Sequence, residues 1–196
     1  MNNQEIALPE ELKILSRRRV LAGSGLALSA GAIALLGGCD AMAAGAKVSA
    51  VELESDVRIL NTALGAEYEA VAAYQVGAES GLLTKEVLGV AVTFQGHHKE
   101  HAAAIAGTIH KLGGKAVSAK SKYVFPVEKL KSQSDVLQFA AGLEKGAISA
   151  YLGAVPLFAD KALAQVAASI LGDEAMHWAV LRHVLGENPV PAAFMS

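Results

Sequence analysis

The chain has 196 residues, of which 53% are hydrophobic and 18% are charged, and its formal net charge is −2. So small a charge excludes a nucleic-acid binder that works by neutralising phosphates, and the hydrophobic fraction excludes intrinsic disorder. Because only 5% of the residues are aromatic, the core must consist mainly of alanine and aliphatic side chains. Alanine is the strongest helix former, so this composition favours an all-helical domain.

The first 38 residues have the pattern of an export signal peptide. Residues 16–19 read Ser-Arg-Arg-Arg and precede a mildly apolar run over 20–36. A basic region before a short apolar stretch is typical of secretion, and the arginine pair resembles a twin-arginine signal. Val20 stands where the usual consensus of that signal has phenylalanine. Residues 36–39 read Leu-Gly-Gly-Cys, which resembles a lipobox and implies acylation of Cys39.

We therefore expect an exported, periplasmic protein that is tethered to the membrane as a lipoprotein through Cys39. The alternatives are an uncleaved anchor helix and ordinary cleavage after residues 41–43. Cys39 is the single cysteine of the chain, which excludes an intramolecular disulfide and a cysteine zinc site. Residues 39–50 are rich in alanine, glycine and serine and are expected to form a flexible tether.

Four amphipathic helices are predicted in the remaining chain, over 50–81, 84–112, 134–153 and 161–185. The connection over 115–133 carries five lysines and Pro126, so it is expected to be a long crossover without a helix. Two short hairpin loops on either side of one long connection are the topology of a ferritin-like bundle. The predicted fold is thus an all-α, antiparallel four-helix bundle over 51–188, with a tail over 189–196.

An internal repeat links the first and third predicted helices. Both contain the pattern Glu-x-x-Ala-(Val/Ile)-x-Ala-Tyr, at 67–74 and at 144–151. Downstream, Gln95 and His98 align with Glu174 and His177. The two halves have nearly the same spacing, because His98 follows its repeated glutamate by 31 residues and His177 follows its own by 33. All six histidines fall on the second and fourth helices. Each half therefore predicts a helical hairpin that sets one glutamate opposite one histidine.

Glu67 and Glu144 lie on the apolar faces of their predicted helices. Polar groups on inward faces are costly unless they are paired, and two buried carboxylates repel each other. A divalent metal ion between them removes this penalty, and neutral imidazoles can complete its coordination. The repeat therefore predicts a metal site inside the bundle.

Over about 51–188 the sequence resembles the ferritin-like di-iron or di-manganese carboxylate proteins. The resemblance is closest to exported bacterial ferritin-like domain proteins, whose first helix is similar to residues 60–68 of this chain, Leu-Asn-Thr-Ala-Leu-Gly-Ala-Glu-Tyr. That family holds two metal ions with one glutamate from each of two helices and Glu-x-x-His from each of the other two. The resemblance implies five metal ligands: Glu67, His98, Glu144, Glu174 and His177.

Gln95 departs from the family pattern because it stands where a bridging glutamate is expected. An amide is neutral and coordinates metals weakly, through its oxygen alone. The site could then hold two ions with lower affinity, or a single ion through Glu144, Glu174 and His177. In a third outcome a neighbour on the same helix substitutes for the missing carboxylate; the candidates are His97, Glu100 and His101.

Tyr74 and Tyr151 follow their glutamates by seven residues, about 10 Å along a helix axis. We expect both rings to pack in the core. The alternative is a role beside the metal ions, as outer groups around the ligands or as redox-active groups.

The resemblance implies one or two ions of iron or manganese and a redox function, either oxidation of ferrous iron or consumption of peroxide. Dioxygen or peroxide would then be the reaction partner. Two alternatives stay open: a non-catalytic periplasmic protein that binds or stores metal, which Gln95 favours, and a metal-free helical scaffold. No nucleic-acid partner is expected, and a homodimer through an exposed helix face remains an open alternative.

Overall fold

The computed structural model describes residues 48–195, and the expected signal peptide and Cys39 lie outside the described residues. Within this range the chain forms four long helices, α2 (Ala50–Glu79), α3 (Lys85–Lys111), α4 (Gln133–Ala154) and α5 (Lys161–Val184). Short 3₁₀ turns occupy η2 (Val127–Lys129) and η3 (Val155–Leu157), and residues 48–195 contain no strand. The predicted all-α four-helix bundle is confirmed, and each helix end lies within two residues of its expected position.

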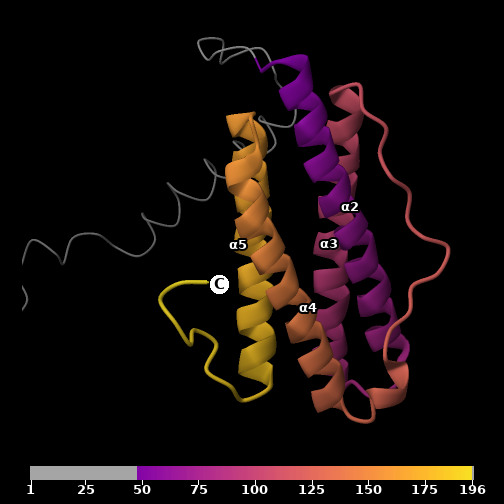
Figure 1. Ribbon diagram of the computed structural model, residues 1–196. Helices are drawn as coiled ribbons and strands as arrows, with labels where there is room; N and C mark the ends of the chain where they lie inside the picture. The colour runs from indigo at the N-terminus through magenta and orange to yellow at the C-terminus, as the bar shows by residue number, and fades with distance from the viewer. Residues whose placement is uncertain (1–47, 196) are drawn as a thin grey trace, which may run out of the picture. The chain divides into compact units, whose positions relative to one another are not determined.

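The four helices form two hairpins, α2 with α3 and α4 with α5 (Figure 1). The segment from 112 to 132 connects the hairpins and runs along the outside of the bundle from the end of α3 to the start of α4 (Figure 1). Asn61 attaches the start of this crossover to α2, because its side chain donates to Lys115 O at 3.0 Å and accepts from Val117 N at 2.7 Å. The long crossover therefore lets both hairpins run up and down the same bundle.

Each helix begins at a side chain that suits this position. Ser49 and Glu52 form a capping box at the start of α2. At the starts of α3, α4 and α5 a side-chain oxygen accepts from backbone N–H groups of the first turn; these residues are Thr84, Ser132 and Asp160. Gly113 and Gly186 follow α3 and α5 with φ of 76° and 77°, a conformation that suits glycine at the end of a helix.

Two hydrophobic clusters fill the bundle, and a polar layer lies between them along the helices. The first cluster includes Leu60, Leu64, Ile105 and Ile109. The second includes Val87, Phe94, Leu137 and Trp178. Burial of these side chains is the main favourable term in folding, and it also supplies the dry surroundings in which the polar layer is held. Over residues 48–195, none of the helices has the length and apolar composition needed to cross a membrane.

Candidate metal centre

All five predicted metal ligands meet in the polar layer. They come from all four helices, and the exposed fraction of each is 3% or less. Their placement follows from the helical period, because each occupies an inward position between apolar residues of the two clusters. The residues are Glu67 on α2, His98 on α3, Glu144 on α4, and Glu174 and His177 on α5.

His101 joins this layer as a sixth side chain and divides it into two overlapping groups. In each group the potential ligand atoms lie within 4.8 Å of one another. The first group contains Glu67, His98, His101 and Glu174, and the second contains His98, Glu144, Glu174 and His177. His98 and Glu174 belong to both groups and therefore lie between two candidate metal positions.

Five buried polar atoms of this layer have no hydrogen-bond partner. They are Nδ1 of His101, Oε2 of Glu144, Oε1 and Oε2 of Glu174, and Nδ1 of His177. Buried polar atoms in proteins are nearly always satisfied, so five orphaned atoms at one place require an explanation. Carboxylate oxygens and imidazole nitrogens are the donors that divalent first-row metals accept, so these residues fit a metal ion.

The charges of the layer depend strongly on one another. Burial lowers the pKa of His98, but hydrogen bonds to Glu144 and Glu67 outweigh burial and raise this pKa to about 10. In the same way the carboxylates around His101 and His177 outweigh burial and raise each of these pKa values to about 9. The protonated imidazoles in turn hold the pKa of Glu144 well below its usual range, although burial opposes this. In the metal-free protein, protons on the histidines therefore balance the carboxylates.

Tyr74 and Tyr151 bind the glutamates across the bundle. The Tyr151 hydroxyl on α4 donates to Glu67 Oε1 on α2 at 2.6 Å, and the Tyr74 hydroxyl on α2 donates to Glu144 on α4. Both rings are buried in the hydrophobic clusters, so they also pack as expected. The pattern of residues along the chain does not predict this pairing, because each tyrosine contacts the glutamate of the opposite hairpin and not the one seven residues before it.

A more exposed group covers one side of the layer. The carboxylate of Asp173 lies 3.1 Å from His97 Nδ1, 3.4 Å from His101 Nε2 and 3.2 Å from His177 Nε2. His101 and His177 thus face Asp173 with Nε2 and the buried glutamates with Nδ1. A carboxylate on the outer nitrogen fixes which ring nitrogen carries hydrogen, which orients a metal-binding histidine. Sequence reasoning missed Asp173, although it directly precedes Glu174.

Three of the candidate residues on α3 lie outside both groups: His97, which belongs to the more exposed group around Asp173, and Gln95 and Glu100. Gln95 is buried, but its Nε2 donates to Val71 O at 3.0 Å and to Gln75 at 2.8 Å, so the amide is turned to α2. Lys99 donates to the Gln95 oxygen at 2.8 Å. Glu100 is exposed on α3. The structure therefore sets His98, and not Gln95, between the carboxylates.

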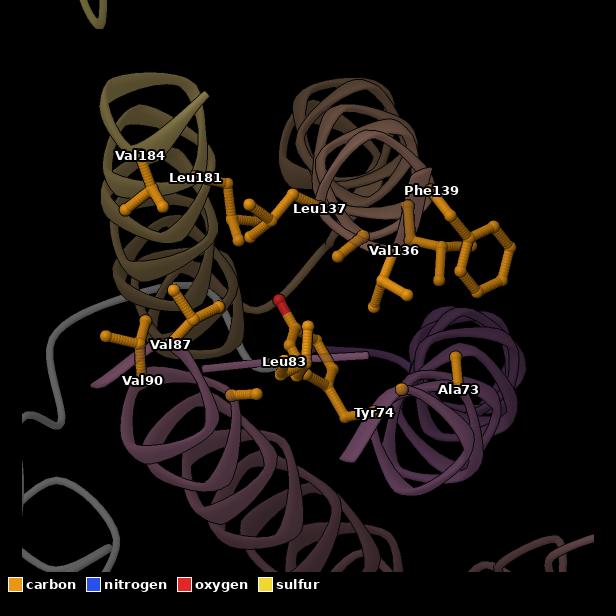
Figure 2. Close-up of a pocket in the computed structure, with 14 residues that line it drawn as sticks. Ala73, Tyr74, Leu83, Val87, Val90, Val136, Leu137, Phe139, Leu181 and Val184 are labelled. Carbon is orange, nitrogen blue, oxygen red and sulfur yellow. The ribbon is translucent and has the colours of Figure 1, made fainter. Parts of the chain in front are cut away.

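An apolar pocket lies next to the layer, among side chains of all four helices. Its lining includes Val87, Leu137 and Leu181, and Figure 2 shows the Tyr74 ring within it, with its hydroxyl directed between the helices. Since this hydroxyl donates to Glu144, Tyr74 separates the pocket from the carboxylates. The pocket gives the layer an apolar neighbour on this side.

Comparisons with known proteins agree with this architecture. A family model described as a ferritin-like domain matches residues 55–187. A conserved hypothetical protein, rv2844, from Mycobacterium tuberculosis is 22% identical, with a TM-score of 0.63 over 73% of this chain and 99% of that one. A structure of ferritin-like, diiron-carboxylate proteins from Bacillus anthracis str. Ames is 19% identical, with a TM-score of 0.60 over 70% and 99% of the two chains. No match was found among curated proteins. The chain belongs to the ferritin-like domain family.

Proposed function

We propose that this protein binds iron or manganese inside the bundle and uses the bound metal to oxidise ferrous iron or to consume peroxide. The observation that carries the proposal is the set of five buried oxygen and nitrogen atoms in the polar layer that make no hydrogen bond. The ligands would be drawn from the six residues of the two groups: Glu67, His98, His101, Glu144, Glu174 and His177.

The side chains of the layer have separate tasks in this proposal. When bound, iron or manganese supplies electron transfer to or from dioxygen or peroxide. Glu144 and Glu174 supply negative charge, and Tyr74 and Tyr151 restrain two of the carboxylates by hydrogen bonds. Asp173 orients the rings of His101 and His177. The apolar clusters on both sides exclude water from the layer and so strengthen its electrostatic interactions.

Metal analysis tests the binding part of this proposal. The full chain is loaded with ferrous or manganous ions without oxygen, separated from free ions, and its metal content is measured. We expect at least one ion per chain, and none in a Glu144→Ala variant that keeps its helical circular dichroism. A matched control is Glu100→Ala, which removes an exposed carboxylate from α3. A metal-free wild type after loading would leave only the scaffold function.

Oxidation kinetics test the redox part. We expect the wild type to oxidise ferrous iron faster than buffer does, and Glu144→Ala to return the rate to that of buffer. A second candidate is a protein that stores or delivers metal without turnover. The composition of the layer favours this second function. Three glutamates and three histidines meet there, and three carboxylates neutralise two divalent ions less well than four would. Metal content with no rate above buffer would select this second function.

We also propose export and attachment to the periplasmic face of a membrane through acylated Cys39. The support is the sequence of residues 16–39 alone. Cells expressing the full chain are grown with a radiolabelled fatty acid and then fractionated. We expect label on the wild type and none on Cys39→Ser; an unlabelled wild type would exclude the lipid anchor.

A further inference from the structure

The two hairpins are related by a nearly constant offset in sequence, and this offset identifies the counterpart of Glu174. Glu67 and Tyr74 precede Glu144 and Tyr151 by 77 residues each. At an offset of 76, His101 corresponds to His177. The same offset matches the pair 97–98, His-His, with the pair 173–174, Asp-Glu. In α3, two histidines thus stand where α5 has two carboxylates.

The contacts support this correspondence. His101 Nδ1 lies 3.6 Å from Glu67 Oε2 and 3.3 Å from Glu174 Oε1. In the other half, His177 Nδ1 lies 3.6 Å from both Glu144 Oε1 and Glu174 Oε2. Glu174 therefore turns one oxygen to each half of the layer.

His98 occupies the matching central position on α3. Its Nδ1 lies 2.9 Å from Glu67 Oε2 in one half, and its Nε2 lies 3.4 Å from Glu144 Oε1 in the other. An imidazole therefore stands opposite Glu174, where the symmetry of the repeat would have set a second carboxylate between the two metal positions.

An imidazole cannot replace a carboxylate in this position without a consequence. A carboxylate offers lone pairs on both oxygens, whereas a neutral imidazole has one lone pair and carries hydrogen on its other nitrogen. His98 must lose one of its two ring N–H hydrogens when a metal ion binds, and because a carboxylate can only accept, the 2.9 Å contact with Glu67 keeps the remaining hydrogen on Nδ1. The lone pair of Nε2 then points to the half that contains Glu144 and His177.

We propose that this centre binds one divalent transition-metal ion, through His98 Nε2, Glu144, Glu174 and His177, and not the two ions of a symmetric centre. In the other half, Glu67 accepts hydrogen bonds from His98 Nδ1 and from Tyr151, and His101 Nδ1 lies 3.3 Å from Glu174 Oε1 as an ion-pair contact. This inference rests on the metal binding proposed above and specifies its stoichiometry and position.

To test the stoichiometry, the metal-stripped full chain is titrated with Co²⁺. Calorimetry and the visible absorption of the bound ion are the two readouts of this titration. We expect one ion per wild-type chain. His98→Glu restores Glu-x-x-His on α3 and is expected to bind two ions, with affinities within about tenfold of each other. Gln95→Glu is the matched control, because it adds a carboxylate to the same helix outside the two groups, and it is expected to bind one.

A second pair of variants keeps the test decisive if His98→Glu does not fold. Glu144→Gln is expected to weaken Co²⁺ binding by about 100-fold or more, and Glu67→Gln by about tenfold, the size of effect found for outer hydrogen-bonding groups. Two ions of similar affinity in the wild type, or equal losses in the two variants, would overturn the single-ion assignment. A wild type that binds no Co²⁺, Fe²⁺ or Mn²⁺ would instead overturn the proposed metal binding itself.

Discussion

The two hairpins have matching backbones and different chemistry. Both set a glutamate on the first helix and a histidine on the second at almost the same offset, and each supplies a tyrosine to the glutamate of the other. They differ at the central position, where α3 has His98 and α5 has Glu174. The comparison shows that helical geometry determines where an inward side chain lies, whereas the residue at that place determines the charge and the donor atoms that the layer offers.

The ends of the bundle repeat this comparison. Asp56 on α2 is completely buried and accepts from Ala159 N and Asp160 N, both at 2.9 Å, at the start of α5. At the other end, Gln133 on α4 accepts from Thr84 N at 2.8 Å, at the start of α3. Each hairpin therefore supports the start of the second helix of its partner, with the stronger set of contacts at Asp56.

The largest effect is expected from removal of the carboxylate that both halves share. Glu174→Gln leaves a nearly isosteric amide, which is neutral and a weak ligand. The affinity for Co²⁺ is therefore expected to fall by more than about 100-fold, which is the upper limit for variants of groups that only hydrogen-bond to metal ligands. Calorimetric titration measures this loss. Glu100→Gln is the matched control on the exposed face of α3. Unchanged affinity in Glu174→Gln would remove the central residue from the site.

The two ends of the bundle should differ in stability. Asp56→Ala leaves two backbone N–H groups without their partner and is expected to lower the free energy of unfolding by about 3 kcal/mol. Gln133→Ala removes one hydrogen bond in a more exposed place and is expected to cost about 1 kcal/mol. Urea denaturation of the metal-stripped chain measures both values. Equal losses would show that the two ends contribute alike.

Tyr74 and Tyr151, each of which donates to the glutamate of the other hairpin, are expected to contribute equally to stability. Tyr74→Phe and Tyr151→Phe each remove one hydrogen bond to a buried carboxylate, and each is expected to lower the free energy of unfolding by about 2 kcal/mol. Thermal denaturation of the metal-stripped protein provides the measurement. A combined loss well beyond the sum of the single losses would show that the two hydrogen bonds are coupled through the layer. A double variant as stable as the wild type would leave the tyrosines with packing alone.

The smallest difference is expected between His101 and His177, in their effect on how stability depends on pH. The pKa of His101 and of His177 is raised from the ordinary 6.5 to about 9. A raised pKa in the folded state contributes stability that is complete below pH 6.5 and is lost as the pH rises through 9. The metal-free wild type should thus lose stability between pH 7 and 10. His101→Gln and His177→Gln should flatten this profile to the same extent, as measured by urea denaturation across the range; a flat wild-type profile would contradict the charge balance described above.

The sequence predicted the helices and two of the buried acids well, because both follow from the 3.6-residue period. Glu67 and Glu144 each lie among aliphatic residues at helical spacing, so the sequence determines that both are on the buried face of their helix. The same period made the second helix ambiguous. Gln95, His98 and His101 follow one another at intervals of three, so all three share roughly one face and each fits the alignment.

Equal loop lengths in the two hairpins would have resolved this ambiguity. The α2–α3 loop and the α4–α5 loop differ in length, so the spacing from the glutamate did not decide whether Gln95 or His98 corresponds to Glu174. Asp173 and the crossed tyrosines were missed for a related reason. Their partners lie on other helices, and a pattern within one helix does not specify which residues of its neighbours come opposite.

The reciprocal contacts between the hairpins have a consequence for a nicked chain. Tyr74, Tyr151, Asp56 and Gln133 all join one hairpin directly to the other, whereas the crossover is attached to α2 at its start through Asn61. Peptide-bond cleavage near residues 118–122, where the side chains are exposed, would break the covalent link and leave these contacts intact. The two fragments should therefore remain associated and co-elute from a sizing column until denaturant separates them.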